Sequence, residues 1–447
     1  MRISLPWDVD VDGLQSQVYP FAVGRRRLSE ADGCCSGSIL EIPNEMLQEI
    51  LMKLPTKDVA RSCCVSRQWR SVVRDPSFRK LHAASHAALS AEAEFLLLSG
   101  VLCELSQSMK TGIFTLSSDK PMCSIAKPHS DGLLNICNGL LCFVLEDRKG
   151  QAPAMVCNPV TGETLALPTA PPLSNKNHVY FFVFGFSPPT NEYKLFRFSF
   201  PPYSYSSEER VDVDVYTLGD ARGWRKDSFL SPSRPPNRRN SISKPVMIDG
   251  KLHVVTKGWN APMGEEAAGV LVVDVPAETC RVYPLPNDLV TYRYDNPLAF
   301  ELKGRLCLAA HMLSGGRPKA IRFWVMSMEN KESDSEKEPH WDLRYNFFVE
   351  VEHPFNTRRP WRRVPWSAWF QYETLCYTRS DTLHRYDTRS SIPDHGRLLQ
   401  WNKQLQTTTI SYKWRWMIYR GYRPTLLSPR VFELPPSQDE TMMDICS

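Results

Sequence analysis

The sequence contains no apolar run long enough to cross a membrane as a helix. A bilayer-spanning helix needs about 20 predominantly apolar residues, and the best run, Val179 to Phe186, is far shorter. The first residues include aspartates where a secretory signal peptide has an apolar core. We therefore expect a soluble protein of the cytoplasm, the nucleus or both, with no membrane partner.

Metal-binding and catalytic signatures are also missing from the sequence. Its 13 cysteines include no CxxC pair and no Cys/His cluster at zinc spacing, and no HExxH is present. There is no glycine-rich phosphate loop and no GxSxG nucleophile elbow. His82 and His86 could share a helix face, but no third metal ligand accompanies them. We expect no metal, no cofactor and no catalytic residue.

Net charge is small, whereas proline is frequent. The 447 residues contain 54 Lys and Arg and 49 Asp and Glu, a net charge of +5, which is too low to indicate a nucleic-acid-binding protein. The 35 prolines make up about 8% of the chain, against a usual share of about 5%. Together with 11% aromatic residues, this composition favours short strands joined by turns.

Helical periodicity is confined to a region near the N-terminus. Residues 1–38 show no sustained pattern and are predicted to form a disordered leader. Three helices are then predicted, beginning near Pro43, Thr56 and Ser66, where proline or a capping hydroxyl suits a helix start. The first helix has one apolar face, formed by Met46, Leu47, Ile50, Leu51 and Leu54. So few residues bury little surface by themselves, so this region is predicted to need a partner.

The pattern of residues in the rest of the chain predicts a repeated β structure. Residues 81–94 are alanine-rich and predict a helical linker, and from Phe95 short β-rich runs alternate with turn signals. Asn138-Gly139, Asp249-Gly250 and Lys303-Gly304 recur before similar strands, and Gly250 and Gly304 are 54 residues apart. Repeats of about 50 residues with four strands each are typical of a kelch-like β-propeller.

The repeat length predicts six or seven propeller blades over residues 95–434, followed by a tail at 435–447. The alternative is a pair of β-sandwiches with similar hairpins. Strand candidates at the two ends, Phe95–Leu98 and Gly112–Leu116 against Thr408–Tyr412 and Arg430–Leu434, are predicted to meet and close the propeller.

Residues 39–80 resemble an F-box. The resemblance rests on Ile42-Pro43, Glu49-Ile50-Leu51, Leu54-Pro55, Val65-Ser66, Trp69 and Asp75-Pro76-Ser77-Phe78, all without gaps. The downstream pieces NGLLCF, NPVTGETLALP and GFSPPTNEYKLFRF resemble the F-box-associated β-domain of plant F-box proteins. The resemblance implies an α+β multidomain protein, with a small three-helix F-box followed by an all-β propeller-like domain.

The same resemblance implies a non-catalytic function. An F-box docks on a Skp-type adaptor and through it on a cullin, and the C-terminal domain holds the protein to be ubiquitinated. The residues it implies for adaptor binding are Pro43, Leu47, Ile50, Leu51, Leu54, Val59, Val65 and Trp69. For each one, interface and internal core remain alternatives. A propeller scaffold whose degenerate F-box acts outside a ligase is the alternative function.

A basic, aromatic stretch lies in the last third of the chain. Arginines there alternate with tryptophan, a mixture found at protein–protein hot spots and in single-stranded nucleic-acid sites. The tryptophans could instead pack between blades beneath the arginine side chains. We expect a protein substrate rather than nucleic acid, on a candidate surface formed by Arg358, Arg359, Trp361, Arg362 and Arg363.

Overall fold

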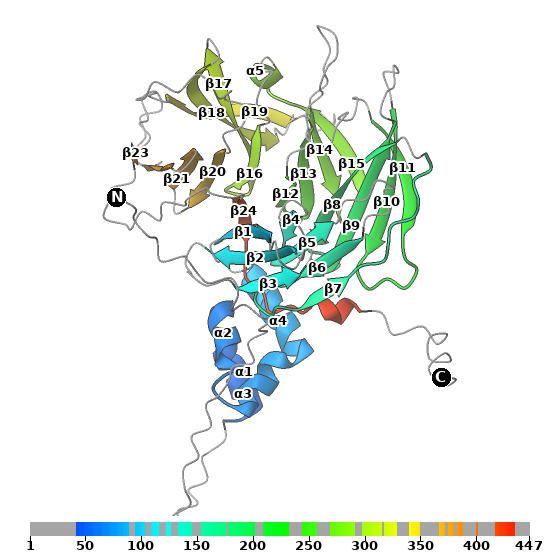
Figure 1. The fold of residues 1–447 in the computed structure, drawn as a ribbon, viewed down its shortest axis with the longest axis vertical. Helices are drawn as coiled ribbons and strands as arrows, with labels where there is room; N and C mark the ends of the chain where they lie inside the picture. The colour runs from blue at the N-terminus through cyan, green and yellow to red at the C-terminus, as the bar shows by residue number, and fades with distance from the viewer. Residues whose placement is uncertain are drawn as a thin grey trace, which may run out of the picture. The chain divides into compact units, whose positions relative to one another are not determined.

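The fold was obtained as a computed structural model and comprises two compact units (Figure 1). One unit extends to Phe78 and the other begins at Arg79. The structure describes residues 42–88, 94–102, 109–115, 122–126, 133–144, 153–175, 178–201, 209–231, 244–256, 269–290, 297–314, 317–328, 339–348, 366–371, 374–379, 382–387, 399–400 and 416–433. The expected leader therefore lies outside the described residues, as does the expected tail.

Helices form where the sequence predicted them. They are α1 (Asn44–Met52), α2 (Thr56–Ser62), α3 (Arg67–Arg74) and α4 (Pro76–Ala88). The Ser66 hydroxyl accepts a hydrogen bond from the backbone N–H of Trp69, which confirms the predicted cap of α3. The expected cap at Thr56 is wrong, because Pro55 precedes α2 and no side chain caps it. Among the described helices, none has the length and apolar character to cross a membrane.

The helix α4 extends across the position where the F-box and the linker were expected to meet. It is continuous from Pro76 to Ala88, and the two compact units divide inside it, after Phe78. Within the second unit, Arg79 forms an ion pair with Glu163 at 3.1 Å.

The described residues of the second unit form six antiparallel sheets of four strands, here called blades I to VI. Each blade is described by its strands in spatial order. Blade I is β24 (Trp416–Tyr422), β1 (Glu94–Leu102), β2 (Met109–Thr115) and β3 (Cys123–Ala126); blade II is β4 (Leu133–Cys137), β5 (Leu140–Val144), β6 (Ala154–Cys157) and β7 (Thr164–Ala166). Blade III is β8 (Val179–Ser187), β9 (Glu192–Phe200), β10 (Glu209–Thr217) and β11 (Arg225–Ser231); blade IV is β12 (Val246–Ile248), β13 (Lys251–Thr256), β14 (Gly269–Asp274) and β15 (Thr279–Pro284). Blade V is β16 (Leu298–Leu302), β17 (Arg305–Ser314), β18 (Arg317–Met328) and β19 (Pro339–Phe348); blade VI is β20 (Trp366–Gln371), β21 (Thr374–Arg379), β22 (Thr382–Asp387) and β23 (Leu399–Gln400). Two short helices, α5 (Asn287–Val290) and η5 (Pro429–Phe432), complete the described elements.

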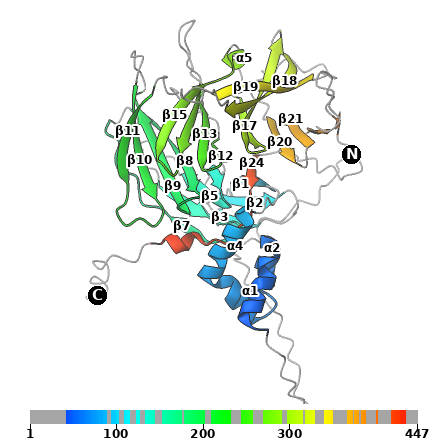
Figure 2. The same ribbon diagram turned by 180° about the vertical axis from the view of Figure 1, so that it is seen from behind.

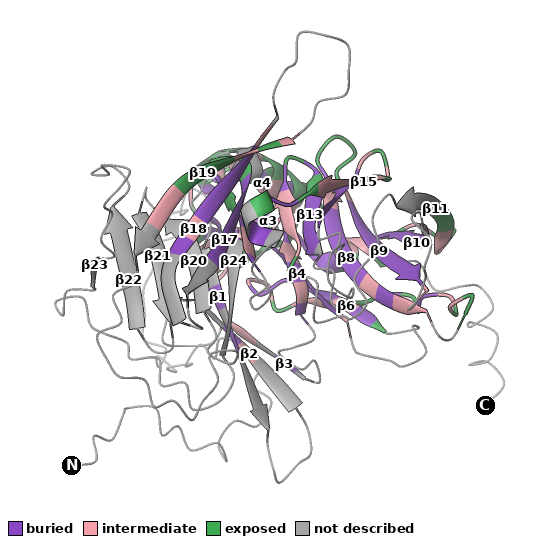
Figure 3. Ribbon diagram, turned by 90° about the horizontal axis from the view of Figure 1, so that it is seen from above, coloured by how far each residue is buried: buried purple, intermediate pink, exposed green. Residues whose placement is uncertain are grey.

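Neighbouring blades pack against each other through apolar side chains. The first strand of blade II, β4, lies beside β24 and β8, and the first strand of blade V, β16, lies beside β12 and β20. Between blades III and IV, Phe196 packs in one cluster with Leu252 and Val273. Buried residues accordingly follow β8 and β13 in Figure 3. At Gly185 a Cβ atom would lie 2.6 Å from Val275 Cγ2, so the close approach of blade IV requires glycine there.

The repeated residue–glycine pairs form the turn between the first and second strands of their blades. Asn138-Gly139 joins β4 to β5, Asp249-Gly250 joins β12 to β13, and Lys303-Gly304 joins β16 to β17. All six residues have positive φ, as a two-residue type I′ hairpin requires. The six sheets confirm the propeller prediction.

Blade I joins the two ends of the propeller's chain. The C-terminal strand β24 pairs antiparallel with β1, with Leu97 opposite Ile418 (Figures 1 and 2). The predicted closure is thus confirmed, but with a different strand. Thr408–Tyr412 lies outside the described residues, and Arg430 to Phe432 belong to the helix η5 rather than to a strand.

Beyond β24, the chain packs against blades II and III. The buried Asn158 side chain donates to the carbonyls of Thr425 and Leu427, at 2.9 and 2.8 Å. Its Oδ1 accepts from the backbone N–H of Val160, so one side chain holds both its own turn and the C-terminal segment. The Phe432 ring lies edge-on to Tyr193, 5.7 Å away.

Removing residues 416–447 deletes β24 and the segment that packs on Asn158. We expect the whole propeller to lose its cooperative unfolding transition, because both the closing strand and a buried set of hydrogen bonds are removed. Thermal unfolding followed by circular dichroism measures this. A truncated protein that melts in one transition at the full-length temperature would contradict it.

A graded variant complements the truncation. Asn158→Ala leaves buried carbonyls without donors, so we expect its free energy of unfolding in urea to fall by about 2–4 kcal/mol. A decrease in the free energy of unfolding of much less than about 1 kcal/mol would argue against a role of this side chain in closure.

Candidate functional site

Exposed apolar side chains gather in the helical unit. The described residues include six large apolar side chains that are exposed, and four of them belong to this unit: Ile42, Met46, Ile50 and Val65. These four are called the apolar set below. Met46 and Ile50 are one helical turn apart on α1 and are 57% and 42% exposed, and Val65, between α2 and α3, is 63% exposed. Concentrated exposed apolar surface marks a site of protein interaction.

The buried side of α1 explains why this surface stays outside the core. Leu47 and Leu51 are fully buried, together with Val59 of α2 and Val72 and Val73 of α3. Because residues four apart share a helix face, Met46 and Ile50 form a second apolar face that these core contacts do not use. The unit therefore has more apolar surface than its own interior takes up.

The structure divides the residues predicted to bind an adaptor into three groups. Leu47, Leu51 and Val59 are buried, Leu54 and Trp69 are half-buried, and Pro43, Ile50 and Val65 are exposed. Burial places the first three side chains in the packing of the protein. The prediction omitted Met46 and Ile42, although Met46 belongs to the periodic pattern and lies four residues before Ile50.

Hydrogen bonds fix α3 beside the exposed residues of α1. The Gln68 side-chain amide donates to the carbonyl of Ile42 at 2.6 Å and to Asn44 Oδ1 at 3.0 Å. The Arg70 guanidinium donates from Nε to the carbonyl of Cys63 at 3.1 Å, in the turn that carries Val65. The first half of α3 is therefore attached to both places where the apolar set is exposed.

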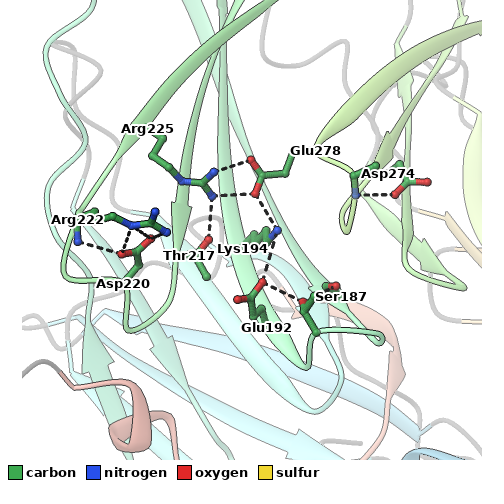
Figure 4. A network of polar contacts seen from close by, with 11 residues as sticks. Ser187, Glu192, Lys194, Thr217, Asp220, Arg222, Arg225, Asp274 and Glu278 are labelled. Carbon is green, nitrogen blue, oxygen red and sulfur yellow. Dashed lines mark hydrogen bonds and ion pairs between the residues drawn. The ribbon is translucent and has the colours of Figure 1, made fainter.

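A polar cavity of about 400 Å³ lies between blades III and IV of the propeller. It is lined by Glu192, Lys194, Thr217, Leu218, Gly219, Asp220, Arg222, Arg225 and Glu278. Figure 4 shows Lys194 between two carboxylates, and its Nζ lies 2.7 Å from Glu278 and 3.6 Å from Glu192. The charges around the cavity are paired, which makes it a link between blades rather than an open charged site.

Glu278 is the centre of this link. It belongs to the turn between β14 and β15 and accepts two hydrogen bonds from Arg225, at 2.8 and 3.0 Å. Its φ is +56°, a conformation that costs a non-glycine residue about 1–3 kcal/mol. Burial by itself would raise the pKa of Glu278, but hydrogen bonds from Arg225 and Lys194 outweigh it and hold the pKa below its ordinary value of 4.5.

Within the described part of the chain, no group of His, Cys, Asp and Glu side chains is arranged to hold a metal ion. His82 is buried in α4. The candidate substrate surface of Arg358, Arg359, Trp361, Arg362 and Arg363 lies outside the described residues, in the connection between β19 and β20.

Comparison with known proteins gives the two units separate matches. The F-box domain family matches residues 39–81, and the family described as F-box associated beta propeller domain matches residues 97–350. The second match covers more than half of the chain.

Similar proteins agree with the F-box match. F-box protein At3g07870 of Arabidopsis thaliana is 27% identical over 68% of this chain and 73% of its own length. F-box/LRR-repeat protein At2g43260 of the same plant is 26% identical over 79% of this chain and 76% of its own length. The beta-propeller domain of the Trilobed protease from Pyrococcus furiosus aligns with 66% of this chain and 82% of that one at 10% identity, and its TM-score of 0.31 is too low to carry an argument.

Glu278→Gln is expected to weaken the link between blades III and IV at neutral pH. The folded-state pKa of Glu278 is lowered, so its contribution to stability is fully present above pH 4.5 and is lost as the pH falls through the lowered value. The wild type should therefore lose more stability than the variant when it is acidified below pH 4.5. Urea denaturation across this pH range measures the difference.

Asp342→Asn is the matched control, because Asp342 and its partner His340 are both about half exposed on β19 of blade V. We expect little change in stability from it. Equal effects of the two substitutions, or parallel pH profiles for wild type and Glu278→Gln, would contradict a link between blades through Glu278.

Proposed function

Since the chain belongs to the F-box proteins that carry an F-box associated beta propeller domain, we propose that it is a substrate-recognition subunit of a Skp–cullin–F-box ubiquitin ligase. In this proposal the helical unit binds the Skp-type adaptor, which in turn binds the cullin. The propeller binds the protein to be ubiquitinated.

The apolar set is the observation that supports adaptor binding. A stable complex gains most of its free energy from a few buried apolar or aromatic anchors near the centre of the interface. Met46, Ile50 and Val65 are large, exposed and located in the unit that matches the F-box family. They are the described residues best suited to act as such anchors.

The connections between strands support a substrate site at one end of the propeller. Tight turns join first and second strands in blades II, IV and V. Except at 127–132, the connections from one blade to the next are longer, at 167–178, 232–245, 285–297, 349–365 and 401–415. In the antiparallel blades these two kinds of connection lie at opposite ends of the strands. Binding residues are most often found on loops held by a rigid scaffold, so we propose the end with the longer connections as the substrate end.

This function requires no catalytic residue in the chain. A receptor that holds a substrate close to a conjugating enzyme loaded with ubiquitin raises the effective concentration of the substrate at that enzyme. Burial raises the pKa of Cys280 to about 12, and it raises the pKa of Cys123 to about 12 as well. Such thiols stay protonated at neutral pH and are unsuited to forming a thioester.

Met46→Ala combined with Ile50→Ala tests adaptor binding. Both side chains are exposed and alanine favours helix, so the helical unit should stay folded. If the two are anchors, truncation should weaken binding of the purified adaptor by roughly a hundredfold. Isothermal titration calorimetry of the full chain measures this.

The matched control is Leu343→Ala, which truncates a large apolar residue that is 48% exposed on β19 of the propeller. It should bind the adaptor as the wild type does. Wild-type affinity in the double variant would contradict the proposed docking surface. Failure of the wild-type chain to bind any adaptor would favour a scaffold with a degenerate F-box.

A further inference from the structure

The exposed face of α3 is a stripe of three arginines. Arg67, Arg70 and Arg74 follow the spacing i, i+3 and i+7, which places them on one helix face, and all three are exposed. The opposite face holds the buried Val72 and Val73. The name arginine stripe is used for these three residues.

Among the described residues, the arginine stripe has no carboxylate partner. In the propeller, Arg79, Arg197 and Arg225 each pair with an acidic side chain. Among the described residues, no carboxylate lies within ion-pair distance of Arg67 or Arg74, and the recorded contact of Arg70 is with a backbone carbonyl. Asp58 of the same unit pairs with Arg61, and Asp75 caps the backbone N–H of Phe78.

Helix stability accounts for Arg74, in the last turn of α3, but not for Arg67. Arg67 is the first residue of α3, where the positive end of the helix dipole disfavours a cation. The helix contains no acidic residue that would form a stabilising pair within it. These positive charges are therefore available to a partner.

The stripe lies beside the turn that carries Val65, one member of the apolar set. Gln68, the neighbour of Arg67, holds α3 against the carbonyl of Ile42, and Arg70 itself bonds to the turn that carries Val65. Apolar anchors with charged residues around them are the usual composition of a protein interface. A partner that covers Val65 therefore also comes close to Arg70.

From this arrangement we propose that the surface of the adaptor that meets α3 is acidic, and that the arginine stripe attracts it and accelerates association. The proposal rests on the proposed function, in which the helical unit binds a Skp-type adaptor. A protein is a better occupant than nucleic acid, since the large exposed apolar side chains of this unit are not aromatic and Trp69, the ring on which a base could stack, is half-buried.

Such an arrangement has a specific kinetic consequence. Charges at the rim of an interface act on the rate of encounter more than on the rate of dissociation. The attraction extends over about 30 Å at ~0.01 M salt and over about 3 Å at ~1 M salt. Loss of the stripe should therefore slow association at low salt and have little effect at high salt.

The test uses the full chain and a purified Skp-type adaptor in stopped-flow experiments at ~0.01 M and ~1 M salt. The variant Arg67→Gln, Arg70→Gln, Arg74→Gln should associate about tenfold more slowly at low salt. Its dissociation rate should stay within about twofold of the wild-type rate, and the two association rates should converge at high salt.

A second variant removes the same number of positive charges from the propeller, with Lys226→Gln, Arg305→Gln and Arg430→Gln, all at exposed positions. It should associate at nearly the wild-type rate. If both triple variants associated equally slowly, the proposal would be overturned, because the association rate would then depend on the net charge of the protein and not on the arginine stripe.

Two further outcomes would also overturn it. One is adaptor association that the stripe variant leaves unchanged at low salt, and the other is stripe-dependent binding of a single-stranded oligonucleotide with unchanged adaptor kinetics. A wild-type chain that binds no adaptor would refute the proposed function itself, so the two failures are distinguishable.

Discussion

The antiparallel pairing of β1 with β24 is the constraint on which the propeller depends. Every other blade is built from four consecutive strands, whereas blade I takes its first strand from the far end of the sequence. Without that strand, β1 would present an unpaired edge, and β4 would lose a neighbour that it contacts. Asn158 adds a second connection, since it holds the segment that follows β24.

The closed propeller and the helical unit differ in which side chains they bury and which they leave exposed. The propeller buries its apolar residues between blades and pairs its buried cations with carboxylates, as in Arg197 with Asp214 and Lys194 with Glu278. The helical unit leaves both apolar side chains and arginines exposed. A receptor that joins two proteins requires two binding surfaces. A stable scaffold can hold one partner, and an incompletely covered helical surface can bind the other.

Local signals in the sequence predicted much of this organisation. Ser66 marked the start of α3 because its hydroxyl satisfies a free backbone donor, and the three residue–glycine pairs marked hairpins because positive φ favours glycine. Helical periodicity could not separate Leu47 from Met46, since both belong to an apolar pattern and only the packing of α1 decides which one is buried. The pairing of Arg225 with Glu278 joins positions 53 residues apart and leaves no sequence pattern.

The central claim is that this chain connects a substrate to a cullin through its F-box. Mixing the full chain with a Skp-type adaptor and a cullin, followed by size-exclusion chromatography with light scattering, tests it most directly. The account predicts one complex with a single copy of each protein, which forms only when the adaptor is present. Elution of the chain apart from the adaptor and the cullin would contradict it.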